Sequence, residues 1–312
     1  MRAFQRLGND VRFIGYRELL GDKYHDIIRM LLSRSSTFRD FSKPLWLTKL
    51  NEIFFETASR FNPDLILSIK GETLLPKYIT KLRKQTGAAL ALWFPDDPRF
   101  FNSLTAHIAP YYDVVFTNSQ RATNLYKYIS VNNVHRLPFA CDPEIHKGVL
   151  DAQNILKRAL FIGTYSPKRY SFIKNLVRCG IPIDVIGSNW PFLFNKYVVS
   201  PSVLGPQYAR RIQSYSVILN IHQDLSYGPN MRTFEVTGSG GVLLSDRAED
   251  ITNFFTEGSE MLVYDSLEDA AQKIKYLIEN SDASYTVASN GQKKCHNRYT
   301  YDERARQILK LL

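Results

Sequence analysis

The chain has 312 residues, of which 44% are hydrophobic and 22% charged, and this profile fits a soluble globular protein with two α/β domains. Its formal net charge of +10 suits three kinds of partner: nucleic acid, an anionic membrane surface or phosphorylated small molecules. Zinc-finger and RNA-binding motifs are missing from the sequence, which disfavours nucleic acid. No apolar run reaches the length of a membrane span, and the polar N-terminus is unlike a secretory signal.

Three cysteines, Cys141, Cys179 and Cys295, lie far apart and form no CxxC pair. We therefore expect neither a zinc site nor a disulfide framework, and we expect the chain to work in the reducing cytoplasm.

The first half alternates short apolar runs with stretches of helical periodicity. Residues 2–7 predict a helix and residues 11–14 a strand. Residues 73–86 predict a further helix, which Gly87 ends in a left-handed conformation. The other predicted strands are residues 64–69, 89–94 and 113–117. Their consecutive apolar side chains are typical of parallel strands that are buried on both faces.

The pattern weakens between residues 141 and 157 and then restarts, which predicts a hinge near residue 150. Further strands are predicted at residues 159–163, 183–187, 217–221, 241–245 and 261–264. Further helices are predicted at residues 167–179, 207–215, 231–238, 267–280 and 283–296. This alternation predicts an α/β fold of two doubly wound parallel sheets, with domains at residues 1–150 and 151–296 that face a central cleft.

The last segment, residues 297–312, carries a capping box, in which Thr300 and Glu303 satisfy each other's backbone amides. The helix that follows has an apolar face formed by Ala305, Ile308, Leu309 and Leu312. Such a face needs a surface to cover, and we expect the helix to pack back on the N-terminal domain.

The most informative residues are Arg232 and Glu235, three apart near the start of a short predicted helix. A helix N-terminus with an arginine suits a diphosphate, because the amides, the helix dipole and the guanidinium all favour an anion. A neighbouring glutamate can accept hydrogen bonds from two vicinal ribose hydroxyls. The alternative is a purely structural Arg–Glu pair that caps the helix.

Several segments together resemble one known family. The most specific are residues 230–235 (NMRTFE), 240–246 (GGVLLSD) and 255–260 (FTEGSE), and the supporting segments are residues 63–67, 93–98, 137–143, 161–169, 186–190 and 219–222. Their order and spacing resemble the CgeB-like (spore maturation protein) glycosyltransferases of the GT-B superfamily, which have a glycosyl transferases group 1-like C-terminal domain. The resemblance implies two Rossmann-like lobes, an acceptor-side lobe followed by a nucleotide-sugar-binding lobe.

The resemblance also implies roles for individual residues. Glu235 matches the glutamate that holds the ribose, and Arg232, Lys168 and Arg169 would neutralise the diphosphate leaving group without a metal. Asn230 and His222 would line the sugar pocket. The other donor-side candidates are Gly163, Tyr165, Asn189 and Trp190. Gly163 permits close approach of a phosphate, whereas Trp190 either stacks on the nucleobase or belongs to the core.

Two features depart from the family pattern. Many superfamily members carry a second glutamate eight residues before the ribose-binding one, where this chain has Tyr227. Such lobes also usually open with an apolar strand, whereas this chain begins with residues that predict a helix. Either the start of the sequence is misplaced or the first sheet lacks that strand.

Asp96 and Asp97 follow a predicted strand of the first domain, and with His222 they are the catalytic candidates. One aspartate would act as general base for an acceptor hydroxyl, which would invert the anomeric carbon; the alternative is turn chemistry before Pro98. The remaining histidines show no metal-ligand spacing, so no metal is expected: His25, His107, His135, His146 and His296.

The sequence thus predicts a metal-independent glycosyltransferase, of the hexosyltransferase type, with no cofactor. A UDP- or GDP-sugar is the expected donor, and a glycan or a lipid-linked molecule is the expected acceptor. The basic charge leaves room for peripheral contact with an anionic membrane, on the inner face of the cell membrane. Two alternatives stay open: a nucleotide-sugar epimerase or hydrolase on the same scaffold, and a non-catalytic protein that binds a sugar nucleotide or a polyanion.

Overall fold

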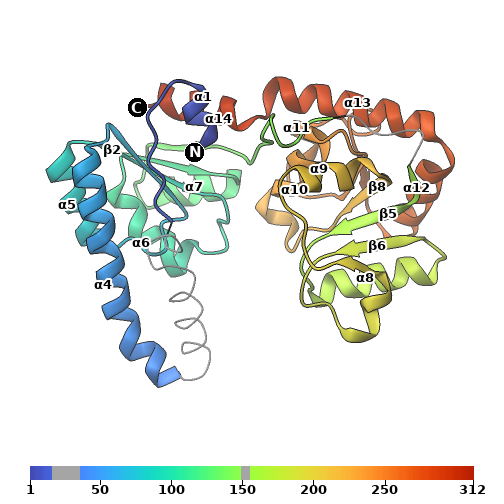
Figure 1. Cartoon of the computed structure of the whole chain (residues 1–312), viewed down its shortest axis with the longest axis horizontal. Coiled ribbons are helices and arrows are strands. Elements are labelled where there is room, and N and C mark those ends of the chain that lie inside the picture. Colours follow the sequence, from blue (N-terminus) through green and yellow to red (C-terminus); the bar gives the residue numbers. More distant parts are fainter. Residues whose placement is uncertain (16–35, 149–154) are drawn as a thin grey trace. The chain divides into compact units, whose positions relative to one another are not determined.

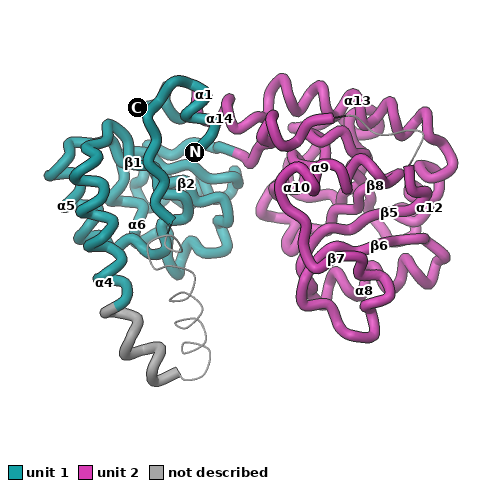
Figure 2. The backbone as a smooth tube through the Cα atoms, in the orientation of Figure 1, with its two compact units in different colours: residues 1–137, 308–312 teal, residues 138–307 magenta. Residues whose placement is uncertain are grey.

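A computed structural model describes residues 1–15, 36–148 and 155–312 of the chain (Figure 1). The chain forms two compact units: residues 1–137 with 308–312, called unit 1, and residues 138–307, called unit 2 (Figure 2). The division falls at Leu137, before the hinge that the sequence suggested near residue 150. Residues 149–154, which include the predicted hinge position, and His25 lie outside the described residues.

Unit 1 contains a parallel sheet, which has four strands in the described part of the chain, in the order β1-β2-β3-β4. The strands are β1 (Leu65–Ile69), β2 (Ala89–Phe94), β3 (Val114–Thr117) and β4 (Val134–Arg136). The α-helices are α1 (Arg2–Arg6), α4 (Ser36–Phe61), α5 (Pro76–Thr86), α6 (Ala106–Ile108) and α7 (Gln120–Tyr128), and single turns are η1 (Phe101–Thr105) and η2 (Ala109–Tyr111). β2 and β3 are buried along almost their whole length, as their unbroken apolar runs predicted.

Local sequence explains how α5 is delimited. Pro76 occupies its first turn, where a missing N–H costs nothing, and Gly87 ends it with φ 68°, as predicted. Asn51 of α4 is fully buried and fixes the approach to α5. Its amide donates to the Thr73 carbonyl at 2.7 Å and accepts from the Leu75 N–H at 2.9 Å.

The predicted strand at residues 11–14 is wrong. These residues adopt neither helix nor strand, and Phe13 is 53% exposed. A strand needs a neighbour to hydrogen-bond its backbone, and within the described residues none pairs with this segment.

Unit 2 contains a second parallel sheet, and its described strands follow the order β10-β9-β8-β5-β6-β7. The strands are β5 (Leu156–Ile162), β6 (Ile183–Ile186), β7 (Val198–Ser200), β8 (Tyr215–Asn220), β9 (Leu243–Asp246) and β10 (Leu262–Tyr264). The helices are α8 (Pro167–Arg178), η3 (Phe192–Tyr197), α9 (Pro206–Gln213), η4 (Leu225–Tyr227), α10 (Met231–Gly238), α11 (Ile251–Phe254), α12 (Leu267–Glu279), α13 (Ser281–Arg298) and α14 (Tyr301–Lys310).

The strands on the two sides of β5 are added to the sheet in opposite directions. From β5 the chain proceeds outward to β6 and β7, and it then returns to β8 on the other side of β5. The carboxyl ends of β5 and β8 therefore form a topological switch point, which is where doubly wound sheets bind ligands.

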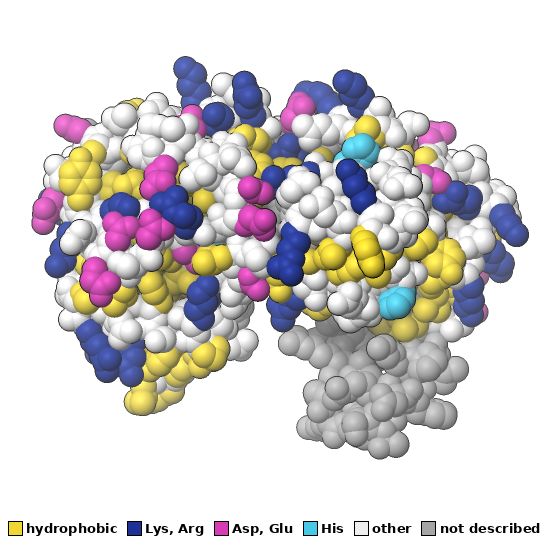
Figure 3. Space-filling view, turned by 180° about the vertical axis from the view of Figure 1, so that it is seen from behind, with side chains coloured by type: hydrophobic (Ala, Val, Ile, Leu, Met, Phe, Trp, Pro, Cys, Tyr) yellow, Lys and Arg dark blue, Asp and Glu magenta, His cyan; other side chains and the backbone are white. Residues whose placement is uncertain are grey.

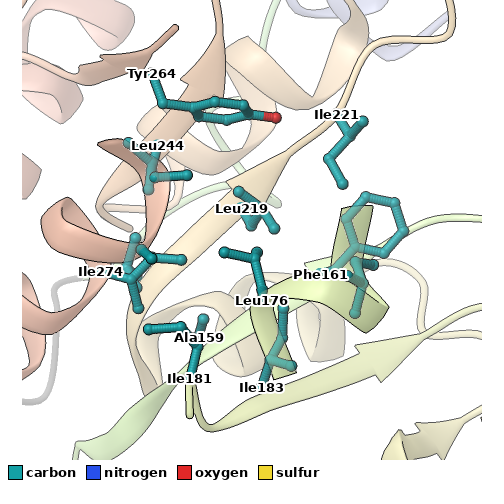
Figure 4. Close-up of a cluster of buried hydrophobic side chains, with 14 of the residues drawn as sticks. Ala159, Phe161, Leu176, Ile181, Ile183, Leu219, Ile221, Leu244, Tyr264 and Ile274 are labelled. Atoms are coloured by element: carbon teal, nitrogen blue, oxygen red, sulfur yellow. The ribbon is translucent and has the colours of Figure 1, made fainter. Parts of the chain in front are cut away.

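Two buried layers of side chains hold unit 2 together. α8 and α12 cover one face of the sheet, where Ala159, Leu176, Leu219 and Ile274 meet in a continuous core (Figure 4). α9 and α10 cover the other face (Figure 1), where Phe234 is among the fully buried side chains. On the surface, Lys and Arg side chains are spread over the face of both units that Figure 3 shows and do not form one continuous patch there.

The last helix, α14, begins as predicted, because the Thr300 hydroxyl accepts from the Glu303 N–H at 3.2 Å. Its predicted apolar face is only partly correct. Ala305 and Ile308 are buried, whereas Leu309 is 38% exposed and Leu312, beyond the helix, 46%. The last turn lies at the end of the chain and buries little. Residues 308–312 belong to unit 1.

Within the three described ranges, no helix combines the length and the apolar character that crossing a membrane requires.

Candidate functional site

The helix α10 starts next to the switch point of unit 2 and has the bounds that the sequence predicted. Asn230 is its N-cap, and the Asn230 side-chain oxygen accepts from the Thr233 N–H at 3.3 Å. Asn220, at the end of β8, exchanges two hydrogen bonds with the Asn230 side chain, at 2.9 and 3.2 Å. The start of α10 is therefore tied to the carboxyl end of the central strand.

A buried carboxylate fixes the loop between β8 and α10. Asp246, the last residue of β9, accepts from the His222 backbone N–H at 2.9 Å and lies 2.5 Å from His222 Nδ1. The other ring nitrogen, Nε2, accepts from the Asn230 N–H at 3.1 Å, so Nδ1 carries the ring proton and donates to Asp246. The line of hydrogen bonds from Asp246 through His222 to Asn230 holds the N-cap of α10 in place.

This geometry corrects the role predicted for His222. Both ring nitrogens are occupied by the protein, and the residue is only 2% exposed. A general base needs a nitrogen within reach of the proton that it removes. In this arrangement His222 positions the loop, and neither of its ring nitrogens is available to a substrate.

Arg232 and Glu235 lie on one side of α10, as predicted, and both are half-buried. Arg232 Nε is buried and has no hydrogen-bond partner within the described part of the chain. Burial raises the pKa of the Glu235 carboxyl, although the neighbouring Tyr208 hydroxyl and Arg232 both lower it. A buried guanidinium nitrogen with no partner is costly, so an acceptor such as a phosphate oxygen would suit it.

Lys168 approaches the same place from the start of α8, where Ser166 is the N-cap. Lys168 Nζ donates to the His222 carbonyl at 2.7 Å and lies 3.7 Å from Asp246. Its side chain is 45% exposed, so it remains accessible to an anion. Lys168 therefore lies at the carboxyl edge of the sheet, and its predicted contact with a diphosphate stays a prediction.

Arg169 does not take part as predicted. It is 5% exposed, and Nε and Nη2 both donate to the Ile221 carbonyl while Nη1 donates to the Thr164 carbonyl at 3.1 Å. Burial lowers the pKa of Arg169 to about 10. Arg169 thus joins the loops after β5 and β8, and its charge contributes to the site without facing it.

Gly163 and Trp190 also prove to be structural. The Gly163 N–H donates to the Ile186 carbonyl at 2.7 Å, so this amide is not available to a phosphate. The Gly163 carbonyl accepts from Trp190 Nε1 at 3.0 Å, and Trp190 is 8% exposed within the aromatic core. Trp190 therefore does not stack on a nucleobase. Gly187 permits this packing, because a Cβ there would lie 1.9 Å from the Gly163 carbonyl oxygen.

Two other donor-side candidates stay near this loop. Tyr165 is half-buried, its ring packs edge-on against Trp190, and its N–H donates to the Ser188 carbonyl at 3.1 Å. Asn189 is exposed and has a left-handed backbone with φ 65°. Both remain accessible at the carboxyl edge of β6.

In unit 1, Asp96 and Asp97 follow β2 but have opposite surroundings. Asp97 is fully buried; Tyr126 and Thr105 donate to its carboxylate, the latter at 2.7 Å, and burial raises its pKa. Asp96 is 35% exposed in its side chain and forms an ion pair of 2.5 Å with Lys70. The structure therefore makes Asp97 an internal anchor, contrary to its predicted catalytic role, and leaves Asp96 accessible.

Sequence reasoning missed Asp246, Tyr208 and Lys70. Asp246 stands at the end of the GGVLLSD segment, and an acidic residue directly after an apolar strand was the available signal. Tyr208 and Lys70 come from segments that no motif singled out. Among the described residues, no group of three or more His, Cys, Asp or Glu side chains could hold a metal ion.

Comparison with known proteins assigns the fold. Residues 169–310 match the model of a family described as glycosyl transferase-like. The fold is that of the GT-B glycosyltransferases. Sucrose-phosphate synthase from Thermosynechococcus elongatus aligns with a TM-score of 0.64 at 14% identity, over 88% of this chain and 78% of that one. None of the curated proteins compared with the chain matches it.

Two further solved structures support the same fold. HepE from Anabaena, in complex with UDP-glucose, aligns with a TM-score of 0.60 at 14% identity, over 84% of this chain and 81% of HepE. TarM from S. aureus, in a complex that includes UDP, aligns with a TM-score of 0.61 at 11% identity, over 84% of this chain and 58% of TarM. At such identities the likeness concerns the fold.

Proposed function

We propose that this chain is a metal-independent glycosyltransferase of the hexosyltransferase type, related to the CgeB-like group. It would move a sugar from a UDP- or GDP-sugar to a hydroxyl group of a glycan or a lipid-linked acceptor in the cytoplasm. The observation that carries this proposal is the pair on α10: Arg232, with a buried nitrogen that lacks a partner, beside the half-buried Glu235. The family match over residues 169–310 and the UDP-glucose complex of HepE support it.

The donor would lie across the switch point of unit 2. Arg232, Lys168 and the positive end of the α10 dipole would bind the diphosphate and stabilise the charge that it gains when the glycosidic bond breaks. Glu235 would accept hydrogen bonds from the ribose hydroxyls. The network from Asp246 to Asn230 holds these groups in place before the donor binds, which lowers the cost of ordering them.

Asp96 is the stronger candidate for the acceptor side. Its accessible carboxylate could accept the proton of an attacking hydroxyl, and its ion pair with Lys70 would hold that carboxylate in position. A base that activates the acceptor directly would lead to inversion at the anomeric carbon.

The donor site can be tested by thermal unfolding with UDP, GDP, TDP, ADP and CMP. A nucleotide at a hundred times its Kd should stabilise the protein by about 2.7 kcal/mol. Glu235→Ala should abolish the shift given by the preferred nucleotide, while Glu279→Ala, at the exposed end of α12, should retain it. If no nucleotide shifts the midpoint, or if Glu235→Ala retains the shift, the assignment of this site is wrong.

Transfer itself needs a separate assay. Labelled sugar from UDP-glucose or GDP-mannose should enter a polysaccharide or lipid fraction of a cell extract when the protein is added. Asp96→Asn should stop this transfer and leave nucleotide binding intact. Release of free sugar only would favour a hydrolase, and nucleotide binding without any turnover would favour a binding protein.

A further inference from the structure

The turn η3 of unit 2 displays two large apolar side chains side by side. Phe192 is 84% exposed and Leu193 is 87% exposed, which places them with Tyr128 as the most exposed large hydrophobic residues among those described. Val199, on the adjoining edge strand β7, is 47% exposed. Hydrophobic and basic side chains lie next to each other at the lower end of unit 2 in Figure 3. We name the pair Phe192 and Leu193 the apolar tip.

A cluster of aromatic rings around Phe194, called the base, supports the apolar tip. Phe194 is buried; its ring stacks on Trp190 at 5.4 Å between ring centroids and packs against Tyr170 at 5.2 Å and Tyr197 at 4.8 Å. The base fixes the backbone from which the tip projects. Two apolar side chains held outward in this way have already lost much of the backbone entropy that insertion into another phase would cost.

Basic side chains flank this base on two sides. Lys174 Nζ lies 5.5 Å from the centre of the Tyr170 ring, and Lys196 Nζ lies 5.0 Å from that of Tyr197. Residues 155–223 contain nine Lys and Arg but a single acidic residue, Asp184, which Arg158 already pairs at 2.8 Å. Lys174 and Lys196 therefore place positive charge beside the rings that support the tip.

We propose that the apolar tip and its flanking lysines dock this protein on an anionic lipid bilayer. Two adjacent apolar side chains are too little surface for a stable protein interface, which needs about 1,000 Å². They do suit reversible membrane binding, in which the apolar groups enter the boundary of the acyl chains and the lysines stay at the headgroups. The positive charge of these lysines favours anionic lipids over neutral ones.

The test is co-sedimentation of the full chain with two kinds of vesicle, phosphatidylcholine alone and phosphatidylcholine with about one-third phosphatidylglycerol. Wild-type protein should pellet with the anionic vesicles, much less with the neutral ones, and less as salt increases. Phe192→Ser with Leu193→Ser should weaken the partition at least about tenfold, because burying the two side chains contributes more than the free energy of one tenfold step. Lys174→Gln and Lys196→Gln should each weaken it about fivefold.

Tyr276→Ser is the matched control, since Tyr276 is 53% exposed on α12 of the same unit and should leave vesicle binding unchanged. A retained nucleotide-induced thermal shift in the double variant would show that it is folded. Failure of the wild-type protein to pellet with anionic vesicles would overturn the proposal, as would equal binding by the double variant. A loss of dimers in the double variant, seen by analytical ultracentrifugation without any vesicle binding, would instead make the tip a contact between copies of this chain.

Discussion

The two sheets of this protein end in carboxylates that are used in opposite ways. At the carboxyl edge of the unit 2 sheet, Asp246 is 7% exposed, accepts hydrogen bonds from the backbone and ring of His222, and lies near Lys168. At the carboxyl edge of the unit 1 sheet, Asp96 is accessible and has Lys70 as its ion-pair partner. The first arrangement is an internal scaffold, whereas the second is a surface pair that a ligand can reach.

The two units differ in which side chains the buried carboxylate holds in position. In unit 2 the buried network orders the start of α10, so that Arg232 and Glu235 are in position in the unliganded protein. In unit 1 the corresponding buried group is Asp97, which holds the loop after β2 through Tyr126 and Thr105. In both units the buried carboxylate fixes the loop that follows a strand, next to charged residues that are less buried.

The largest effect should come from removing the unit 2 scaffold. Asp246→Ala leaves the His222 N–H groups without their acceptor and should lower the free energy of unfolding by about 3–5 kcal/mol, measured by urea denaturation. Asp265→Ala is the control: Asp265 lies beyond β10 and pairs with Arg247 at the surface, so its loss should have no measurable effect. Equal stabilities of the two variants would contradict the scaffold.

The next effect separates the two aspartates of unit 1. Asp97→Asn should lower the free energy of unfolding by about 1–3 kcal/mol, since it disturbs a buried hydrogen-bonded group. Asp96→Asn should change it by less than about 1 kcal/mol, because its ion pair with Lys70 is partly exposed. Urea titrations measure the free energy of unfolding of both variants. A larger loss for Asp96→Asn than for Asp97→Asn would contradict the roles assigned to the two aspartates.

A further effect, from His146, should depend on pH. His146 packs edge-on against Tyr208, next to Glu235, and burial lowers the pKa of His146 from 6.5 to about 4, although Asp142 opposes the shift. Between these values the unfolded chain binds a proton that the folded chain does not, so the free energy of unfolding should fall as the pH drops from 6.5 to 4.

His146→Gln should flatten this pH dependence without removing it, since other groups also titrate there. Urea denaturation at several pH values gives the slope for both proteins. An unchanged slope would mean that His146 is protonated in the folded protein and that its burial does not govern this part of the profile.

The elements of this fold could largely be predicted from local sequence, but the contacts within the site could not. The bounds of α10 follow from the Asn230 cap and the helical periodicity, and the end of α5 follows from Gly87; each depends on a few neighbouring residues. The role of His222 depends instead on Asp246, which comes from another strand. Only the strand order brings these two residues together.

The same limit explains the errors at charged and aromatic positions. Asp96 and Asp97 are adjacent in sequence, and which one is buried depends on Tyr126 of α7. Arg169 and Trp190 had the residue types expected of a donor site, yet backbone carbonyls of distant loops bind their polar groups. A polar residue's function depends on whether its partners lie within the protein or outside it, which a single sequence does not reveal.

We propose that Arg232 binds the diphosphate of a nucleotide, and calorimetric titration tests this role most directly. The preferred nucleoside diphosphate and its parent nucleoside would be titrated into wild-type protein and into Arg232→Gln. A charge-assisted hydrogen bond contributes about 1.5–3 kcal/mol, so the variant should bind the diphosphate at least about tenfold more weakly and the nucleoside as before. Unchanged diphosphate affinity, or an equal loss for both ligands, would contradict the account.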